Sequence, residues 1–217
     1  MKTVTELGNV DAKLVTISLT GDGRREQLLL KAFAERYNGK EFVLQLPTTI
    51  APLGHGNKLT GRFVGFSVLQ TIKTYVSTYK FTRYLFLIDR EHLNDNDLIS
   101  EIKNNLTGFN QINITALAAQ AFLISCNLGS HDLIIHVIVC GEKKCIEENI
   151  AKLILLEFGT HVEPIKPDIE RALNQHDSNL YILIKNAKSN NLDQAFTDLT
   201  AAFSNIESIL HLRKSRK

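Results

Sequence analysis

Residues 83–92 read RYLFLIDREH, and this stretch decides the fold that the sequence predicts. Its unbroken apolar run is typical of a strand that is buried on both faces of a parallel sheet. The run ends at two carboxylates, Asp89 and Glu91, spaced i, i+2. Ligands of open α/β sheets gather beyond the carboxyl ends of such strands. These acids are therefore either cation ligands or the start of a solvated loop.

The chain around this strand alternates between strand and helix patterns. Strands are expected at residues 13–19, 41–46 and 84–88, and helices at 24–37, 63–78 and 95–106. This alternation is typical of parallel α/β units with right-handed crossovers. Two later apolar stretches, 121–126 and 133–140, flank the turn residues NLGSHD and predict an antiparallel hairpin. We expect a Rossmannoid α/β fold with a mostly parallel, mixed sheet flanked by helices.

The last part of the chain has a helical pattern. Residues 143–158 and 191–212 carry apolar side chains at three- and four-residue spacing. The stripe in the second segment either packs on the core or supports self-association, which leaves a homo-oligomer open. We divide the chain into an α/β core at 1–160 and a C-terminal helical extension at 161–217, packed on that core.

Composition predicts a soluble cytoplasmic protein. The net charge of +2 over 217 residues is too small to argue for nucleic-acid binding by bulk charge. Cys126, Cys140 and Cys145 form no CxxC pair and are odd in number, which favours a reducing compartment. The first residues lack the apolar segment of a signal peptide, and no apolar run approaches the roughly 20 residues of a membrane span.

A second acidic turn follows the first predicted strand. The glycines of Gly21-Asp22-Gly23 permit a tight turn with the carboxylate of Asp22 exposed, and Glu26 falls in the first turn of the next helix. If strands 13–19 and 84–88 are neighbours, these two acids meet Asp89 and Glu91 at one sheet edge. Clustered carboxylates repel unless neutralised, and hard oxygen ligands suit Mg²⁺ or Mn²⁺. Read singly, Asp22 is a turn residue and Glu26 a helix-terminal acid.

The long loop at 47–61 contains a second candidate element, a phosphate-binding segment. Gly56 exposes backbone amides and Lys58 supplies a positive charge, while Arg24 lies beside the acidic turn. The loop is not a Walker A motif, because its last glycine is followed by Arg-Phe. The dinucleotide fingerprint is also absent, because position 26 is Glu where that motif needs Gly.

An acid-Gly-x-x-Glu turn followed by an apolar strand ending in Asp-x-acid resembles the TOPRIM domain. Primases, topoisomerases, small RNA-maturing nucleases and overcoming-lysogeny-type nucleases share that domain. The resemblance covers residues 13–140 and implies that Asp22 and Glu26 serve in acid/base chemistry or metal binding. It implies that Asp89 and Glu91 bind Mg²⁺. Asp22 stands where the family has Glu, and Glu91 stands where it has a second Asp.

These observations predict a protein for Mg²⁺-dependent phosphodiester or phosphoryl-transfer chemistry on nucleic acid or nucleotide. The alternative is a non-catalytic α/β module that binds a nucleotide or a protein and keeps a degenerate acidic site. His92, directly after the acids, is the histidine most suited to join them. Carboxyl oxygens about 4–5 Å apart would favour the metal-dependent function, because one cation could then reach both.

Overall fold

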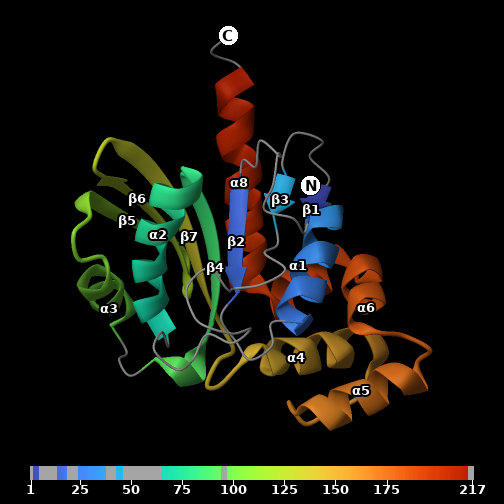
Figure 1. Ribbon diagram of the computed structural model, residues 1–217. Helices are drawn as coiled ribbons and strands as arrows, with labels where there is room; N and C mark the ends of the chain where they lie inside the picture. The colour runs from blue at the N-terminus through green and yellow to red at the C-terminus, as the bar shows by residue number, and fades with distance from the viewer. Residues whose placement is uncertain are drawn as a thin grey trace.

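A computed structural model describes residues 2–4, 14–18, 24–37, 43–45, 65–93 and 97–214. The described strands form one seven-stranded sheet in the order β1-β3-β2-β4-β7-β6-β5 (Figure 1). Their bounds are β1 Lys2–Val4, β2 Leu14–Ser18, β3 Val43–Gln45, β4 Arg83–Asp89, β5 Asn110–Ala118, β6 Ala121–Leu128 and β7 His131–Cys140. All pairings from β1 to β7 are parallel, whereas β6 pairs antiparallel with both β7 and β5. The predicted mostly parallel, mixed α/β sheet is confirmed.

The chain connections that leave β2 and β4 run to opposite sides of the sheet. From β2 the chain passes through α1 (Arg24–Arg36) to β3 on one side of β2. It then returns through η1 (Gly65–Thr71) and α2 (Ile72–Tyr79) to β4 on the other side. Strands β2 and β4 are therefore neighbours, with Val15 opposite Tyr84, so the condition for bringing the two acidic strand ends together is met. Ligands bind at such a switch point in open α/β sheets, beyond the carboxyl ends of the strands.

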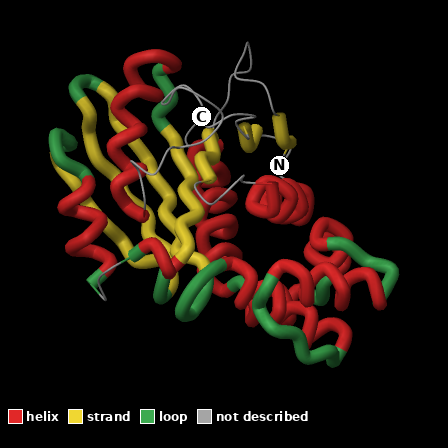
Figure 2. Tube along the Cα trace, turned by 60° about the horizontal axis from the view of Figure 1, so that its bottom comes forward, coloured by secondary structure: helices red, strands yellow, loops and turns green. Residues whose placement is uncertain are grey.

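Two apolar layers cover the sheet, and alternation along β4 supplies both. Tyr84, Phe86 and Ile88 face the layer of η1, α2 and α3 (Leu98–Asn105). Leu85 and Leu87 face the opposite layer, built from α1 and the C-terminal helices. Figure 2 shows the strands as one twisted layer with helices on either side. By the same period of two, Asp89 lies on the side of α1.

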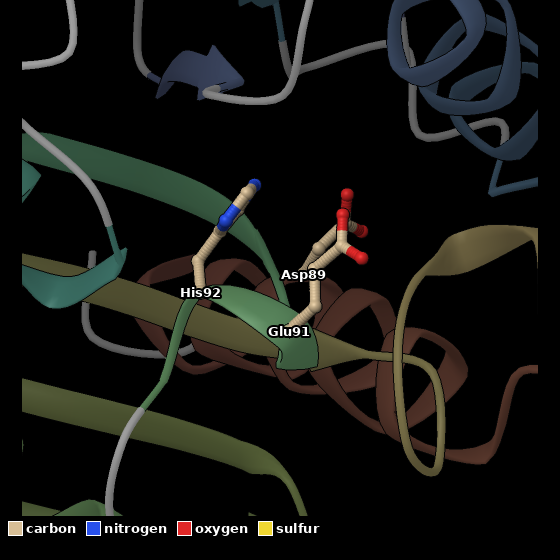
Figure 3. Close-up of side chains that lie close together, drawn as sticks. All are labelled: Asp89, Glu91 and His92. Carbon is tan, nitrogen blue, oxygen red and sulfur yellow. The ribbon is translucent and has the colours of Figure 1, made fainter.

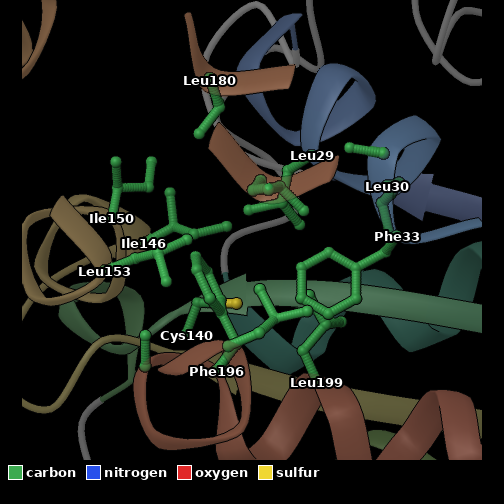
Figure 4. Packing of buried hydrophobic residues seen from close by; sticks show 14 of the residues in the cluster. Leu29, Leu30, Phe33, Cys140, Ile146, Ile150, Leu153, Leu180, Phe196 and Leu199 are labelled. Atoms are coloured by element: carbon green, nitrogen blue, oxygen red, sulfur yellow. The ribbon is translucent and has the colours of Figure 1, made fainter. Parts of the chain in front are cut away.

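The C-terminal helices pack in the same apolar layer as α1. They are α4 (Ile146–Phe158), α5 (Lys166–Gln175), α6 (Leu180–Asn186), α7 (Ser189–Ala195) and α8 (Thr197–Lys214). Figure 4 shows side chains of α1, α4, α6 and α8 converging around Cys140 and Phe196. Arg36 at the end of α1 donates to the Lys185 and Ala187 carbonyls at 3.0 and 2.7 Å, which caps α6. The boundary at residue 160 stays a prediction, because one cluster spans it.

The structure differs from the expected elements in several places. The segment predicted as a helix over 63–78 begins as the 3₁₀ turn η1, and α3 begins after the N-cap Asp97, whose carboxylate accepts the Ser100 N–H. The helix expected at 191–212 is broken at Phe196 into α7 and α8. Strand β5 was not predicted, because an edge strand with no buried residue does not need the unbroken apolar run that marks the central strands.

The stripe of the predicted C-terminal helix packs inside the chain. Its members that the structure describes are each 2% exposed or less: Leu192, Phe196, Leu199, Phe203 and Ile206. Because these side chains are buried within the chain, they are not available for self-association, which remains a prediction. Among the helices that the structure describes, none combines the length and hydropathy needed to cross a bilayer.

Phe33 tests the packing of α1 on the C-terminal helices. Its ring lies 5.5 Å from the rings of both Phe196 and Phe203. We expect Phe33→Ala to lower the free energy of unfolding by about 3–5 kcal/mol, because it leaves a cavity in a fully buried cluster. Chemical denaturation measures this loss. Leu28→Ala, on the same helix but 46% exposed, is the control and should cost under about 1 kcal/mol.

Candidate metal centre

Asp89 ends the central strand and carries a buried carboxylate. The side chain turns toward α1 and α4, and the residue is 6% exposed. Its Oδ1 accepts the backbone N–H of Ile146, the first residue of α4, at 3.2 Å. The first N–H groups of a helix lack intrahelical partners and favour negative charge. The amino terminus of α4 thus supplies partial compensation for the buried charge.

A tight turn after β7 brings α4 to this position. Gly141 has φ +83°, and a Cβ there would lie 2.5 Å from the Cys145 carbonyl oxygen, so only glycine fits. The Glu148 carboxylate accepts the N–H groups of Glu142 and Lys143 at 2.6 and 2.9 Å. This bonding holds the turn as the N3 acid of a capping box does. Gly141 and Glu148 therefore position the Ile146 N–H that bonds to Asp89.

Glu91 and His92 place two further ligand atoms beside Asp89. Both belong to η2 (Arg90–His92), the turn that follows β4. One ligand atom from each of the three side chains lies within 4.8 Å of the others. Figure 3 shows the two carboxylates side by side and the imidazole on the same side of the turn. Gly65 packs against this turn, since a Cβ there would meet the His92 carbonyl oxygen at 2.5 Å.

Two more carboxylates face the same cavity from the flanking helices. Glu26 lies on the stripe of α1 that also contains Leu29, Leu30 and Phe33, so it points toward the sheet. Glu147, in the first turn of α4, is 7% exposed, as is Glu26. The cavity measures about 420 Å³ and is lined by Arg25, Glu26, Asp89, Glu91, His92, Cys145, Glu147, Pro164, Ile165 and Lys166.

Burial and charge crowding act together on Asp89. Burial, together with the charges of Glu26, Glu147 and Glu91, raises its pKa to about 7, and the hydrogen bond from the Ile146 N–H opposes that rise. A bound cation would therefore stabilise the charged form of this carboxylate. Two ligand atoms on opposite sides of a Mg²⁺ ion lie about 4.2 Å apart. The ligand atoms of Asp89, Glu91 and His92 lie within 4.8 Å of one another, so a small rotation of the exposed Glu91 side chain would bring them within reach of one ion. Two carboxylates and an imidazole fit Mn²⁺ at least as well as Mg²⁺.

Arg25 neutralises part of this acidic cluster. Its Nη1 lies 2.9 Å from Glu147 Oε1, and its Nη2 lies 2.8 Å from Glu170 Oε1 on α5. The guanidinium therefore ties α1 to α4 and α5. These ion pairs use Glu147 and leave Asp89, Glu91 and His92 to form the cation set.

The cysteines near the site do not supply a nucleophile. Burial, together with a hydrogen bond to Glu147, raises the pKa of Cys145 to about 12. Burial also holds the pKa of Cys140 well above its ordinary value. Both side chains are therefore thiols at neutral pH, and a thiolate is the reactive form of cysteine.

The structure brings together three of the residues expected from the sequence. Glu26, Asp89 and Glu91 line one cavity, and His92 joins them. Asp22, Gly56 and Lys58 lie outside the described residues, as does the side chain of Arg24. Their roles as ligand, phosphate cradle and cation remain predictions.

Two residues of the cavity carry roles that the sequence did not assign. Glu147, in the first turn of α4, is buried and paired with Arg25. Its position directly after a predicted strand-to-helix junction was the available signal. Lys166 lines the cavity from a segment that is remote in sequence, and nothing in the local pattern marked it.

Comparison of this chain with family models, with curated proteins and with solved structures gave no match.

The charge of Asp89 destabilises the folded protein without a cation. Because the folded state binds this proton more tightly than the unfolded chain, the free energy of unfolding should fall as pH rises from about 4 to 7. Asn keeps the acceptor for the Ile146 N–H without the charge. We expect Asp89→Asn to raise the free energy of unfolding by about 2–4 kcal/mol at pH 8 in EDTA, and by less at pH 5.

Denaturant titrations at both pH values measure this effect. Asp132→Asn is the matched control, because Asp132 is exposed at the amino-terminal end of β7, away from the cluster. It should change stability by less than about 0.5 kcal/mol. An Asp89→Asn protein less stable than wild type at pH 8 would show that the carboxylate is not under electrostatic strain.

Proposed function

We propose that this protein is a metal-dependent enzyme of TOPRIM type, acting on phosphodiester or phosphoryl groups of nucleic acid or nucleotide. The observation that carries the proposal is the buried carboxylate of Asp89 at the switch point of the sheet. Donor atoms of Glu91 and His92 lie within 4.8 Å of it, at the wall of a cavity of about 420 Å³. Mg²⁺ or Mn²⁺ is the cofactor that this donor set suits.

The residues of the cavity divide into three roles under this proposal. Asp89, Glu91 and His92 hold the cation, which when bound supplies Lewis-acid stabilisation of a phosphate oxygen. Glu26 lies at the same cavity and would accept the proton of the attacking water. Lys166 would offset the charge of the phosphate. Asp22, if it follows β2 as the TOPRIM resemblance implies, would complete the acid set.

Crowded acids support metal-dependent chemistry over direct anion binding. A phosphate entering beside Asp89, Glu26, Glu91 and Glu147 would meet like charges that only a cation offsets. The amino terminus of α4 is already used by the Asp89 carboxylate. The cavity therefore favours a metal–phosphate pair over a phosphate alone.

The alternative is a non-catalytic α/β module that binds a nucleotide or a protein. One observation favours it: Arg25, a cation at the cavity, is held by Glu147 and Glu170 at 2.9 and 2.8 Å. An arginine held in two ion pairs is less available to stabilise the negative charge of a phosphoryl-transfer transition state. Such a module would bind metal and ligand without turnover.

A hydrolysis assay separates the two functions. The substrates are bis(p-nitrophenyl) phosphate and single- and double-stranded oligonucleotides, each tested with Mg²⁺, Mn²⁺ or EDTA. We expect activity with Mn²⁺ or Mg²⁺, none in EDTA, and a loss of at least about 100-fold in Asp89→Asn, since removing a charged ligand weakens both binding and catalysis.

Matched variants guard against a loss of fold. Asp132→Asn should retain full activity, and Glu26→Gln should lower turnover while retaining Mn²⁺ binding. Equal activity in wild type and Asp89→Asn would contradict the proposal. Metal binding without hydrolysis of any substrate would favour the non-catalytic module.

A further inference from the structure

A second hollow adjoins the acidic cavity. It measures about 570 Å³ and lies between α1, α4, α5 and α6. That volume is within the range of roughly 300–1,000 Å³ found for small-molecule sites. Arg25 and Lys166 line both hollows, so the two compartments meet at these cationic side chains.

The Arg25 guanidinium marks the boundary between them. Glu147, which pairs with Nη1, lines the acidic cavity, whereas Glu170, which pairs with Nη2, lines the second hollow. The side chain of Arg25 is 16% exposed, so one part of it remains open to a ligand. A planar guanidinium can stack on an aromatic ring and also bond a phosphate.

The second hollow combines an apolar floor with amide groups at its rim. Ile169 and Leu173 of α5 and Ile150 of α4 are buried beneath it, and Leu28 is 46% exposed on α1. Asn174 and Asn179 stand at the rim. The Asn179 Oδ1 accepts the Ile182 N–H at 3.0 Å, and its NH₂ group is the part left to donate to a ligand.

We propose that this hollow binds the base of a nucleotide whose phosphate lies in the acidic cavity. The inference rests on the proposed metal centre and names its substrate class, a nucleoside phosphate. Aliphatic side chains and a guanidinium plane suit the faces of a base, and carboxamides suit its hydrogen-bonding edges. A free mononucleotide and the terminal nucleotide of a strand share this chemistry.

Binding to wild-type protein in Mn²⁺ tests the inference by calorimetry. The probes are AMP, GMP, CMP, UMP, ribose 5-phosphate and a single-stranded 10-mer. We expect at least one nucleotide to bind ten-fold or more tightly than ribose 5-phosphate, since burial of the apolar faces of a base against aliphatic side chains contributes at least about that factor. If none does, the inference is wrong. A 10-mer that binds more tightly than its mononucleotide identifies a strand as the source, and the reverse identifies the free nucleotide.

A filled hollow supplies the matched test. Leu28→Trp adds bulk at the mouth from an exposed position, and Leu155→Trp makes the same change on α4 at a leucine that is 39% exposed and lines neither hollow. Leu28→Trp should weaken binding of the preferred nucleotide at least ten-fold and leave the affinity for ribose 5-phosphate unchanged. Leu155→Trp should alter neither. Unchanged nucleotide binding in Leu28→Trp would overturn the inference.

A metal-free arm separates this inference from the proposed function. The nucleoside of the preferred base, tested in EDTA, should bind wild type and Leu155→Trp but not Leu28→Trp. That result without Mn²⁺ binding would retain the base site and reject the metal centre. Mn²⁺ binding without any nucleoside or nucleotide preference would reject the base site alone.

Discussion

The buried charge of Asp89 is the constraint on which the functional edge of this protein depends. The carboxylate stands at the end of the central strand, where the N–H of Ile146 is its compensating donor and three acids are near enough to raise its pKa. Such a group is costly unless a cation or a proton offsets it. Proteins keep a costly arrangement of this kind mainly where it serves a function. The turn at Gly141 positions the amino terminus of α4, whose Ile146 N–H stabilises the Asp89 carboxylate.

The fold places this charge where a ligand can reach it. The connections from β2 through α1 and from β4 through α3 run to opposite sides of the sheet, which opens the crevice beyond β2 and β4. The C-terminal helices then enclose one side of that crevice. Helix α5 contributes Lys166 and Glu170, and Arg25 links it to α1 and α4. The helical region is therefore part of the wall of the site as well as of the apolar core.

Sequence patterns were sufficient for the inner strands of the sheet and for the acids Glu26, Asp89 and Glu91 of the site. The apolar run at 83–92 predicted a central parallel strand because burial on both faces leaves no alternation, and Asp89 and Glu91 followed from its end. Edge strand β5 was not predicted, because none of its residues is buried and it lacks the unbroken apolar run of the central strands. The roles of Glu147 and Lys166 depend on how α4 and α5 pack against α1. Apart from the position of Glu147 at a strand-to-helix junction, the local sequence carries no signal of that packing.

The central claim is that Asp89, Glu91 and His92 hold one divalent cation. Crystals of the wild-type protein soaked in Mn²⁺ and measured at the manganese absorption edge test it directly. We expect an anomalous peak about 2.1–2.3 Å from oxygens of Asp89 and Glu91, with His92 in the same coordination sphere. We expect no such peak in Asp89→Asn crystals. Soaked crystals with no peak between these side chains, or with manganese bound only elsewhere, would contradict it.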